Sequence, residues 1–220
     1  MTRAVIWDMD GVLVDTGKFH FRAWRRIFQE HGREITEGEL LESFGIKSVD
    51  ILKKVLGDMP LEELRALARR KEQYYREEID GRVVPLPGAQ VLLKALGQTG
   101  FRQALASSAP LVNIGLILET LGVRRCFDAI VSGDEVAEGK PNPEIFLEAS
   151  RRVGVPPERC IVVEDAIAGV NAARAAGMRC LAVTNTNPRE KLCAADMVVD
   201  SLEAVSPQLL DRLLEKDRAS

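Results

Sequence analysis

Short apolar runs alternate with amphipathic stretches along most of this chain. Each run spans a few residues rich in Val, Ile, Leu or Ala, which is typical of a buried strand. Strands that alternate with helices predict an α/β fold built on a doubly wound parallel sheet. The expected strands are residues 4–7, 103–106, 129–132, 160–163, 180–183 and 197–199.

Helical periodicity fills the intervals between these strands. Glycine follows several of the periodic stretches, where it relieves the left-handed strain at the end of a helix. These glycines are Gly100, Gly122, Gly154 and Gly177. The expected helices in this part of the chain are residues 89–96, 112–121, 143–152, 169–176 and 207–215.

One segment, residues 16–82, departs from this alternation. It contains helical periods at residues 21–30, 37–44, 49–56 and 61–78 but no convincing strand. The α/β pattern returns after Val83-Val84-Pro85-Leu86-Pro87-Gly88, in which two prolines favour an extended connector. We therefore expect an α/β core domain of residues 1–15 and 83–220, interrupted by an all-α helical domain of residues 16–82.

Composition and charge restrict the partners that we expect. Of the 220 residues, 46% are hydrophobic and 29% are charged, which suits a globular protein with one full core. The formal charge is -3 and the Lys and Arg residues are spread along the chain, so we expect neither nucleic acid nor a membrane as a partner. A small molecule is the expected partner, and we expect a monomer, since no exposed apolar stripe stands out.

The cysteines and the first residues bear on the cellular compartment. Cys126, Cys160, Cys180 and Cys193 show no metal-type pairing, and we interpret them as reduced residues. The apolar run at residues 4–7 is halted by Asp8, so it is too short for a signal peptide. We therefore expect a cytoplasmic protein.

Four polar motifs close or follow predicted strands. The carboxyl ends of parallel strands meet at one edge of a sheet, where α/β proteins present their reactive groups. In chain order, the motifs are Asp8-Met9-Asp10-Gly11-Val12-Leu13-Val14-Asp15-Thr16, Leu105-Ala106-Ser107-Ser108, Gly139-Lys140-Pro141-Asn142-Pro143 and Val162-Val163-Glu164-Asp165.

Each motif alone also has a purely structural interpretation. Asp15 followed by Thr16 is typical of a helix cap, and Ser107 is typical of a turn. Glu164-Asp165 suits the start of a helix, and Lys140 alone is typical of surface charge. Four motifs in this order favour a function over these separate explanations.

With these motifs in this order, the chain resembles the haloacid dehalogenase superfamily over nearly its whole length. The resemblance is to the branch with a helical cap between the first and second motifs, which includes β-phosphoglucomutase and phosphoglycolate-type phosphatases. It implies a phosphoryl-transfer site with Asp8 as the nucleophile and Asp10 as the general acid and base. It also implies that Ser107 and Lys140 are catalytic residues that contact the phosphate.

Phosphoryl transfer makes demands that such a residue set meets. An anionic carboxylate that attacks an anionic phosphate is repelled, so a cation must bridge them, and oxygen ligands suit Mg²⁺. The resemblance implies a Mg²⁺ cofactor held by Asp8, the backbone carbonyl of Asp10, Glu164 and Asp165. To act as an acid, Asp10 must hold a proton while Asp8 stays ionised.

The helical segment is similar to the β-phosphoglucomutase cap at residues 19–24 and 68–75. His20 there is close enough to the first motif to reach the leaving group or Asp10, and Lys71 falls on a substrate-facing lysine. The plain alternatives are a partly buried helix residue for His20 and an exposed charge for Lys71. The residues expected to bind the substrate are His20, Gly45, Lys47, Lys71 and Ser108.

A mutase must also hold the remote phosphate of a bisphosphate. The position of the cap arginine that serves this purpose in β-phosphoglucomutase is Ser48 here, and Ala109-Pro110 replaces a Ser-Lys pair. Losing these cations weakens the mutase interpretation, because each charge-assisted hydrogen bond contributes about 1.5–3 kcal/mol. Lys47 or Asn113 remain available as substitutes.

The sequence therefore predicts a Mg²⁺-dependent phosphatase that acts on a small phosphomonoester, such as a sugar phosphate, through an aspartyl-phosphate. The alternative is a β-phosphoglucomutase-like mutase. A binding or regulatory protein without turnover is a third hypothesis, against which the complete motif set argues. Dehalogenation is disfavoured, because Asp10 and the acidic metal pair have no role in halide displacement.

Overall fold

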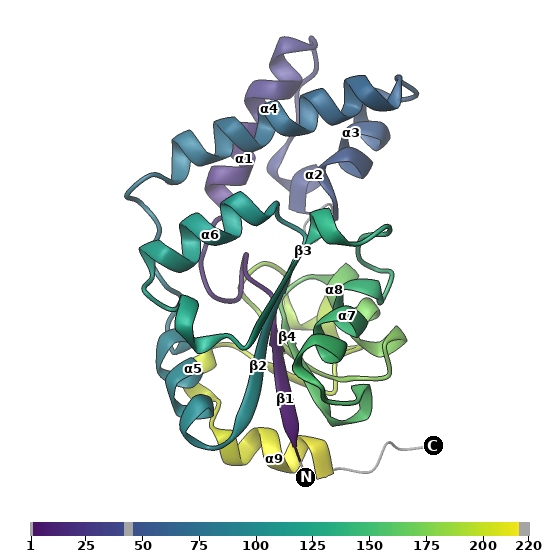
Figure 1. Cartoon of the computed structure of the whole chain (residues 1–220). Helices are drawn as coiled ribbons and strands as arrows, with labels where there is room; N and C mark the ends of the chain where they lie inside the picture. Colours follow the sequence, from purple (N-terminus) through teal and green to yellow (C-terminus); the bar gives the residue numbers. More distant parts are fainter. Residues whose placement is uncertain (1, 42–45, 216–220) are drawn as a thin grey trace.

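The computed structural model describes residues 2–41 and 46–215. Its centre is a sheet of six parallel strands in the order β3-β2-β1-β4-β5-β6 (Figure 1). These are β1 (Arg3–Trp7), β2 (Phe101–Ser107), β3 (Ala129–Ser132), β4 (Cys160–Glu164), β5 (Arg179–Val183) and β6 (Met197–Val199). Each matches an expected strand to within two residues at either end, which confirms the doubly wound parallel sheet.

Helices cover both faces of the sheet. They are α5 (Ala89–Gln98), α6 (Leu111–Thr120), α7 (Glu144–Val153), α8 (Ile167–Ala175) and α9 (Pro207–Glu215). Ala4 and Ile6 of β1 belong to the core formed with α7 and α8, whereas Val5 and Trp7 belong to the core formed with α5, α6 and α9. Burial on both faces explains why the strands are continuous apolar runs.

Short 3-10 turns lie between these elements. They are η1 (Arg124–Cys126), η2 (Gly133–Glu135), η3 (Pro157–Arg159), η4 (Arg189–Leu192) and η5 (Leu202–Ala204). The glycines expected to end helices all adopt positive φ, between 66° at Gly122 and 78° at Gly100. Glycine reaches this conformation without the clash of a Cβ atom, so these positions terminate helices as predicted.

Four helices stand over the carboxyl ends of the strands, at the top of Figure 1. They are α1 (Gly17–Glu30), α2 (Glu37–Leu41), α3 (Ser48–Leu56) and α4 (Leu61–Ile79), and together we call them the helical module. The expected helix 37–44 is described only as far as Leu41. Trp24 and Phe28 of α1 and Tyr75 of α4 are buried in the core of the module. The boundaries of a separate domain at residues 16–82 stay a prediction.

The two connections between the module and the sheet run side by side. The Leu86 N–H donates to the Leu13 carbonyl at 2.8 Å, and Val14 forms an antiparallel bridge with Pro85. Pro85 favours extended backbone, as the sequence predicts for this connector. The module therefore leaves and rejoins the sheet at one place.

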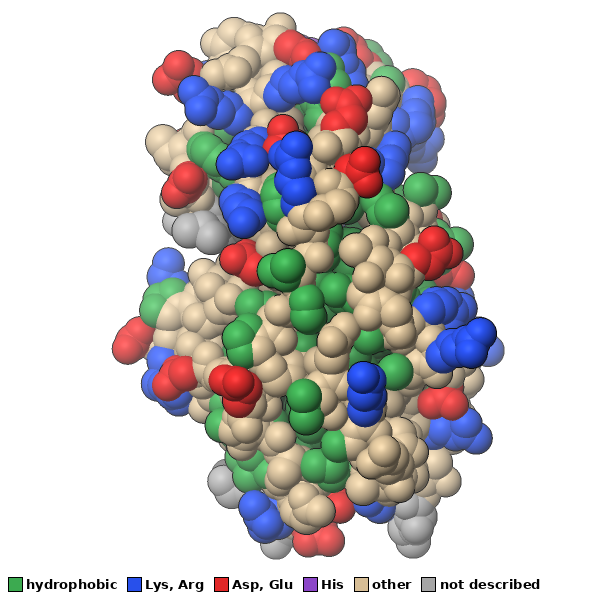
Figure 2. All heavy atoms as spheres, turned by 90° about the vertical axis from the view of Figure 1, so that its left-hand side faces the viewer, with side chains coloured by type: hydrophobic (Ala, Val, Ile, Leu, Met, Phe, Trp, Pro, Cys, Tyr) green, Lys and Arg blue, Asp and Glu red, His purple; other side chains and the backbone are tan. Residues whose placement is uncertain are grey.

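The surface of the module carries charges of both signs. Figure 2 shows Lys and Arg side chains interspersed with Asp and Glu over its upper part. The ion pairs Arg22–Glu78 and Arg26–Glu77, both at 3.1 Å, join α1 to α4 within the module. Such exposed pairs each contribute little to stability. Within the described residues, every helix is too short or too polar to cross a lipid bilayer.

Substitution of β1 tests its burial between two helical layers. Ile6→Ala removes three carbons from a side chain with 0% exposure, so we expect the free energy of unfolding to fall by about 2–5 kcal/mol. Val91→Ala on α5, where the side chain is 74% exposed, should change it by less than about 0.5 kcal/mol. Urea unfolding followed by circular dichroism measures both. Equal effects for the two variants would contradict the layering.

Candidate active site

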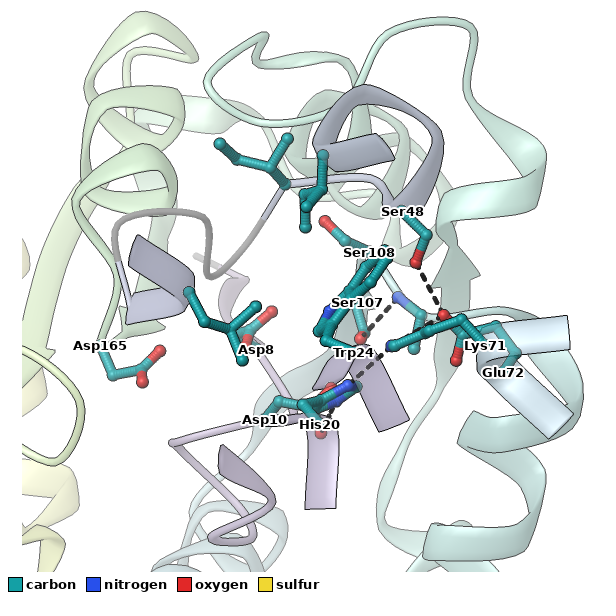
Figure 3. A pocket seen from close by; sticks show the side chains of 14 residues that line it. Asp8, Asp10, His20, Trp24, Ser48, Lys71, Glu72, Ser107, Ser108 and Asp165 are labelled. Carbon is teal, nitrogen blue, oxygen red and sulfur yellow. Dashed lines mark hydrogen bonds and ion pairs between the residues drawn. The ribbon is translucent and has the colours of Figure 1, made fainter. Parts of the chain in front are cut away.

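The four motifs meet at the carboxyl edge of the sheet. Asp8 and Asp10 follow β1, Ser107 ends β2, and Glu164 ends β4, so the two neighbours of β1 flank its carboxylates. The strand order reverses next to β1, and such switch points form crevices in doubly wound sheets. A pocket between this edge and the helical module is shown in Figure 3. Its lining residues are Asp8, Asp10, His20, Trp24, Leu40, Ile46, Ser48, Ile51, Lys71, Glu72, Ser107, Ser108, Ala109 and Asp165.

Lys140 lies between two carboxylates beneath this pocket. Its Nζ donates to Asp8 Oδ1 at 2.5 Å and to Glu164 Oε1 at 2.6 Å, and its side chain has no exposed surface. Burial lowers the pKa of Lys140, but the attraction of Asp8 and Glu164 outweighs it and raises the pKa overall. The other Glu164 oxygen accepts the N–H groups of Asp165 and Ala166, each at 2.8 Å. Glu164 thus holds both the lysine and the turn that follows β4.

The carboxylates of Asp8, Glu164 and Asp165 offer a site for a metal ion. Ligand oxygens of the three lie within 4.8 Å of one another. The Oδ2 of Asp165 is buried and accepts no hydrogen bond from any described residue. Three carboxylates against the one ammonium of Lys140 leave excess negative charge, which a hard divalent cation neutralises. This donor set fits Mg²⁺.

The same excess of charge shows in the pKa values. Burial, and then the proximity of Glu164, raise the pKa of Asp8 to about 7 despite the lowering effect of Lys140. Burial and repulsion from Glu164 and Asp8 raise the pKa of Asp165 well above its ordinary value. Gly11, at φ 83°, lets the Asp165 carboxylate pack against the backbone of the first motif, because a Cβ at this position would overlap that carboxylate.

Asp10 has different surroundings. Its Oδ1 accepts a hydrogen bond from Thr16 Oγ1 at 2.5 Å and from Tyr75 Oη at 3.3 Å, and His20 Nε2 lies 3.5 Å away. Burial raises the pKa of Asp10, but the hydrogen bonds of His20 and Thr16 and the charge of Lys71 lower it below its ordinary value overall. The pKa of Asp8 is therefore raised and the pKa of Asp10 is lowered, because Asp8 faces carboxylates and Asp10 faces hydrogen-bond donors. An Asp10 that acts as an acid beside an ionised Asp8 needs the opposite order.

A chain of polar contacts continues from Asp10 into the module. Lys71 Nζ contacts His20 Nδ1 at 2.8 Å and donates to Glu72 Oε1 at 2.9 Å. A lysine ammonium is only a donor, so Nδ1 accepts and the proton of neutral His20 is on Nε2, which faces Asp10. His20 also stacks on Tyr75, with ring centroids 4.0 Å apart. The structure therefore brings His20 and Lys71 to the pocket.

The other expected substrate contacts have different outcomes. Ser108 lines the pocket, and Gly45 lies outside the described residues. Lys47 does not line it: its Nζ donates to the carbonyls of Val136 and Ala137, at 2.5 and 3.3 Å. Its long side chain therefore joins the module to the loop that precedes Lys140, instead of taking the place of a phosphate ligand.

Comparisons with known proteins agree with this geometry. The haloacid dehalogenase-like hydrolase family matches residues 2–177. The chain belongs to this family. The hydrolase is 33% identical over 224 residues to the beta-phosphoglucomutase of Bacillus subtilis, across 98% of this chain and 97% of that protein. It is 35% identical over 176 residues to the fructose-1-phosphate phosphatase YqaB of Escherichia coli, across 79% of this chain and 92% of that protein.

A solved structure extends the likeness to three dimensions. The beta-phosphoglucomutase of Clostridium difficile matches the hydrolase with a TM-score of 0.90 and 30% identity, over 98% of each chain. The resemblance inferred from the motifs is therefore confirmed, as is the expectation of an enzyme of this hydrolase family.

Three residues that contact Asp10 or Lys71 escaped the sequence analysis as functional residues. Tyr75 lies four positions after Lys71, so helical spacing alone signals that both share a face of α4. Thr16 precedes α1, but its side chain makes no cap hydrogen bond and binds Asp10 instead. Glu72 gives no local signal, because its partners come from three different elements.

Removal of the buried cation tests its structural role in the hydrolase. Lys140→Met leaves the carboxylates of Asp8 and Glu164 without their common partner, so we expect a loss of about 3–5 kcal/mol in unfolding free energy. Lys94→Met, at an exposed position of α5, is the matched control and should be nearly neutral. Urea denaturation at neutral pH measures both, and a neutral Lys140→Met would contradict the buried ion triad.

Thermal unfolding tests the metal site without an activity assay. Mg²⁺ at 100 times its dissociation constant should stabilise the wild type by about 2.7 kcal/mol, a shift of about 5–10 °C in Tm. Asp165→Asn should abolish this shift and, in chelator, melt no lower than the wild type, because it relieves repulsion among the carboxylates. Asp58→Asn, an exposed control, should keep the full shift. A full Mg²⁺ shift in Asp165→Asn would exclude that residue as a ligand.

Proposed function

We propose that this hydrolase is a Mg²⁺-dependent phosphatase that cleaves small phosphomonoesters, such as sugar phosphates, through an aspartyl-phosphate on Asp8. The observation that carries the proposal is the position of Asp8 in the pocket, paired with Lys140 and adjacent to the Asp165 carboxylate. The sugar phosphatase among its relatives supports the substrate class.

In the first step, an Asp8 oxygen forms a bond to phosphorus while the bond from phosphorus to the ester oxygen breaks. Lys140 offsets the charge of the Asp8 carboxylate, and Ser107 donates to a phosphate oxygen. Asp10 gives a proton to the leaving oxygen. The dianionic phosphate favours this proton, since nearby negative charge raises the pKa of a carboxyl group.

In the second step, Asp10 removes a proton from water, whose oxygen attacks phosphorus and releases phosphate from Asp8. The lowered pKa of Asp10 and its contacts with Thr16 and Tyr75 suit this base role, because they hold an ionised carboxylate in place. Mg²⁺ bound by Asp8, Asp165, the Asp10 carbonyl and Glu164 would neutralise the phosphate and keep Asp8 ionised.

Mutase chemistry is the second candidate, and the likeness to the beta-phosphoglucomutases of Bacillus subtilis and Clostridium difficile favours it. The side chains argue for hydrolysis. Ser48, at the position expected for the phosphate-binding arginine, donates to Glu72 at 2.7 Å. Lys47 is engaged with the backbone of residues 136–137. Neither provides a cation for a second phosphate.

The helical module acts, in this proposal, as a cap that closes over the substrate. The pocket has a volume of about 60 Å³, which holds a few water molecules. The module must therefore move away from the sheet for a sugar phosphate to enter. The paired connectors at Leu13–Leu86 and Val14–Pro85 supply a single place about which it can turn.

Replacement of the nucleophile tests the proposed function. Asp8→Asn keeps the shape of the side chain but removes its nucleophilic oxygen, so we expect phosphate release to fall by about 10⁴-fold or more. Asp15→Asn, an exposed change in the same motif, should retain activity. Circular dichroism verifies that both variants fold. Activity of Asp8→Asn near that of the wild type would rule out Asp8 as the nucleophile.

The assay itself separates the two candidates. Phosphate release is measured from a panel of sugar and short-acid phosphates with Mg²⁺, and again with chelator. A parallel coupled assay follows conversion of β-glucose 1-phosphate to glucose 6-phosphate, primed with the bisphosphate. Release without isomerisation supports the phosphatase. Efficient isomerisation with little release would replace it by the mutase.

A further inference from the structure

We propose that Glu72 determines substrate specificity: its carboxylate rejects a second anionic group on the substrate and accepts a hydrogen bond from a hydroxyl group instead. This inference rests on the proposed phosphatase function, because it states which phosphomonoesters the same pocket takes. The site would accept a polyol or sugar that carries one phosphate and would discriminate against bisphosphates.

The position of Glu72 gives it access to the substrate. It is on α4 and lines the same pocket as Asp8 and Ser107, although only 6% of its surface is exposed. In Figure 3, Lys71 and Glu72 lie on the opposite side of the pocket from Asp8 and Asp165. A phosphate held at Asp8 therefore directs the rest of its molecule toward Glu72.

The contacts of Glu72 keep its charge in place. Oε1 accepts hydrogen bonds from Ser48 Oγ at 2.7 Å and Lys71 Nζ at 2.9 Å, and Oε2 accepts one from Asn113 Nδ2 at 2.7 Å. Burial raises the pKa of Glu72, but the charge of Lys71 and the hydrogen bonds from Ser48 and Lys71 lower it overall. Glu72 is thus a fixed carboxylate within the pocket wall.

No cation in the described residues is available to offset a second phosphate at this end. Lys71 is paired with Glu72, so the two together are neutral. Arg76 donates to Asn113 Oδ1 at 2.9 Å and does not line the pocket, and Lys47 is bound to residues 136–137. A second phosphate would meet the Glu72 carboxylate with no net positive charge beside it, and an anion buried without a compensating cation binds unfavourably.

A hydroxyl group finds a suitable partner at the same point. A carboxylate can accept about four hydrogen bonds, and Glu72 already accepts three from protein donors. The remaining acceptor position on Oε2 suits a substrate O–H. Trp24, Ile46 and Ile51 line the pocket beside it and suit the carbon framework of a sugar.

Glu72 also links the helical module to the sheet, and the test must separate that role from selectivity. Asn113 on α6 donates to Glu72 and accepts from Arg76, so it joins α4 to the core. Asn113→Ala removes this connection but leaves the carboxylate of Glu72. A purely structural role predicts the same change of selectivity for Glu72→Gln and Asn113→Ala, whereas a role of the charge predicts a change for Glu72→Gln alone.

The experiment compares fructose 1-phosphate with fructose 1,6-bisphosphate under excess Mg²⁺. We expect the wild type to favour the monophosphate in kcat/KM, and Glu72→Gln to shift this ratio toward the bisphosphate by about tenfold or more, mainly through KM. Glu77→Gln removes an equal charge from an exposed position of α4 and should leave the ratio unchanged, as should Asn113→Ala. An unchanged ratio in Glu72→Gln would overturn the proposal.

Binding provides the result when turnover is absent. Calorimetry measures the affinity of both esters for Asp8→Asn protein, with and without Glu72→Gln. A tenfold change of the affinity ratio supports the role of Glu72 even if the wild type hydrolyses no ester. In that case only the proposed phosphatase function is wrong. Equal ratios in the two proteins overturn the role of Glu72 whether or not the wild type is active.

Discussion

The buried contact of Lys140 with Asp8 and Glu164 is the interaction on which the rest of the site depends. Parallel strands deliver carboxylates from β1 and β4 to one sheet edge, where burial makes their mutual repulsion costly. Lys140 compensates two of them and comes from the loop whose carbonyls, at Val136 and Ala137, also bind Lys47 of the helical module. The loop that carries Lys140 therefore also holds the helical module through Lys47.

The pocket has two electrostatically different ends. The end at the sheet brings the carboxylates of Asp8, Glu164 and Asp165 around the one ammonium of Lys140, so these side chains carry excess negative charge. The end at the module contains Lys71 and Glu72 as a neutral pair, with apolar side chains beside it. In the proposed phosphatase, these two ends suit a substrate with one strongly charged group and a neutral remainder that bears hydroxyl groups. On this proposal, the choice between a phosphatase and a mutase depends on a few side chains of the module.

The sheet and its edge could be predicted because their signals are local. Apolar runs mark the buried strands, and topology alone brings the residues that follow β1, β2 and β4 together. The contacts of the helical module with the site could not be predicted in the same way. The sequence places Lys47 at the substrate, whereas the structure directs it to residues 136–137. Thr16 has the sequence signature of a helix cap, yet it binds Asp10. Both outcomes depend on how the module docks, which is set by long-range contacts that no local pattern encodes.

The central place of β1 in the sheet has a consequence for the order of folding. Arg3 pairs with Phe101 and Ala4 pairs with Cys160, so the first strand to leave the ribosome finds its neighbours only after the whole helical module and most of the core have been synthesised. Pairings this distant in sequence form slowly and leave apolar strand edges uncovered in the meantime. The strand that leads into Asp8 is thus completed late, and the helices made in the interval, whose contacts are local, can form before it.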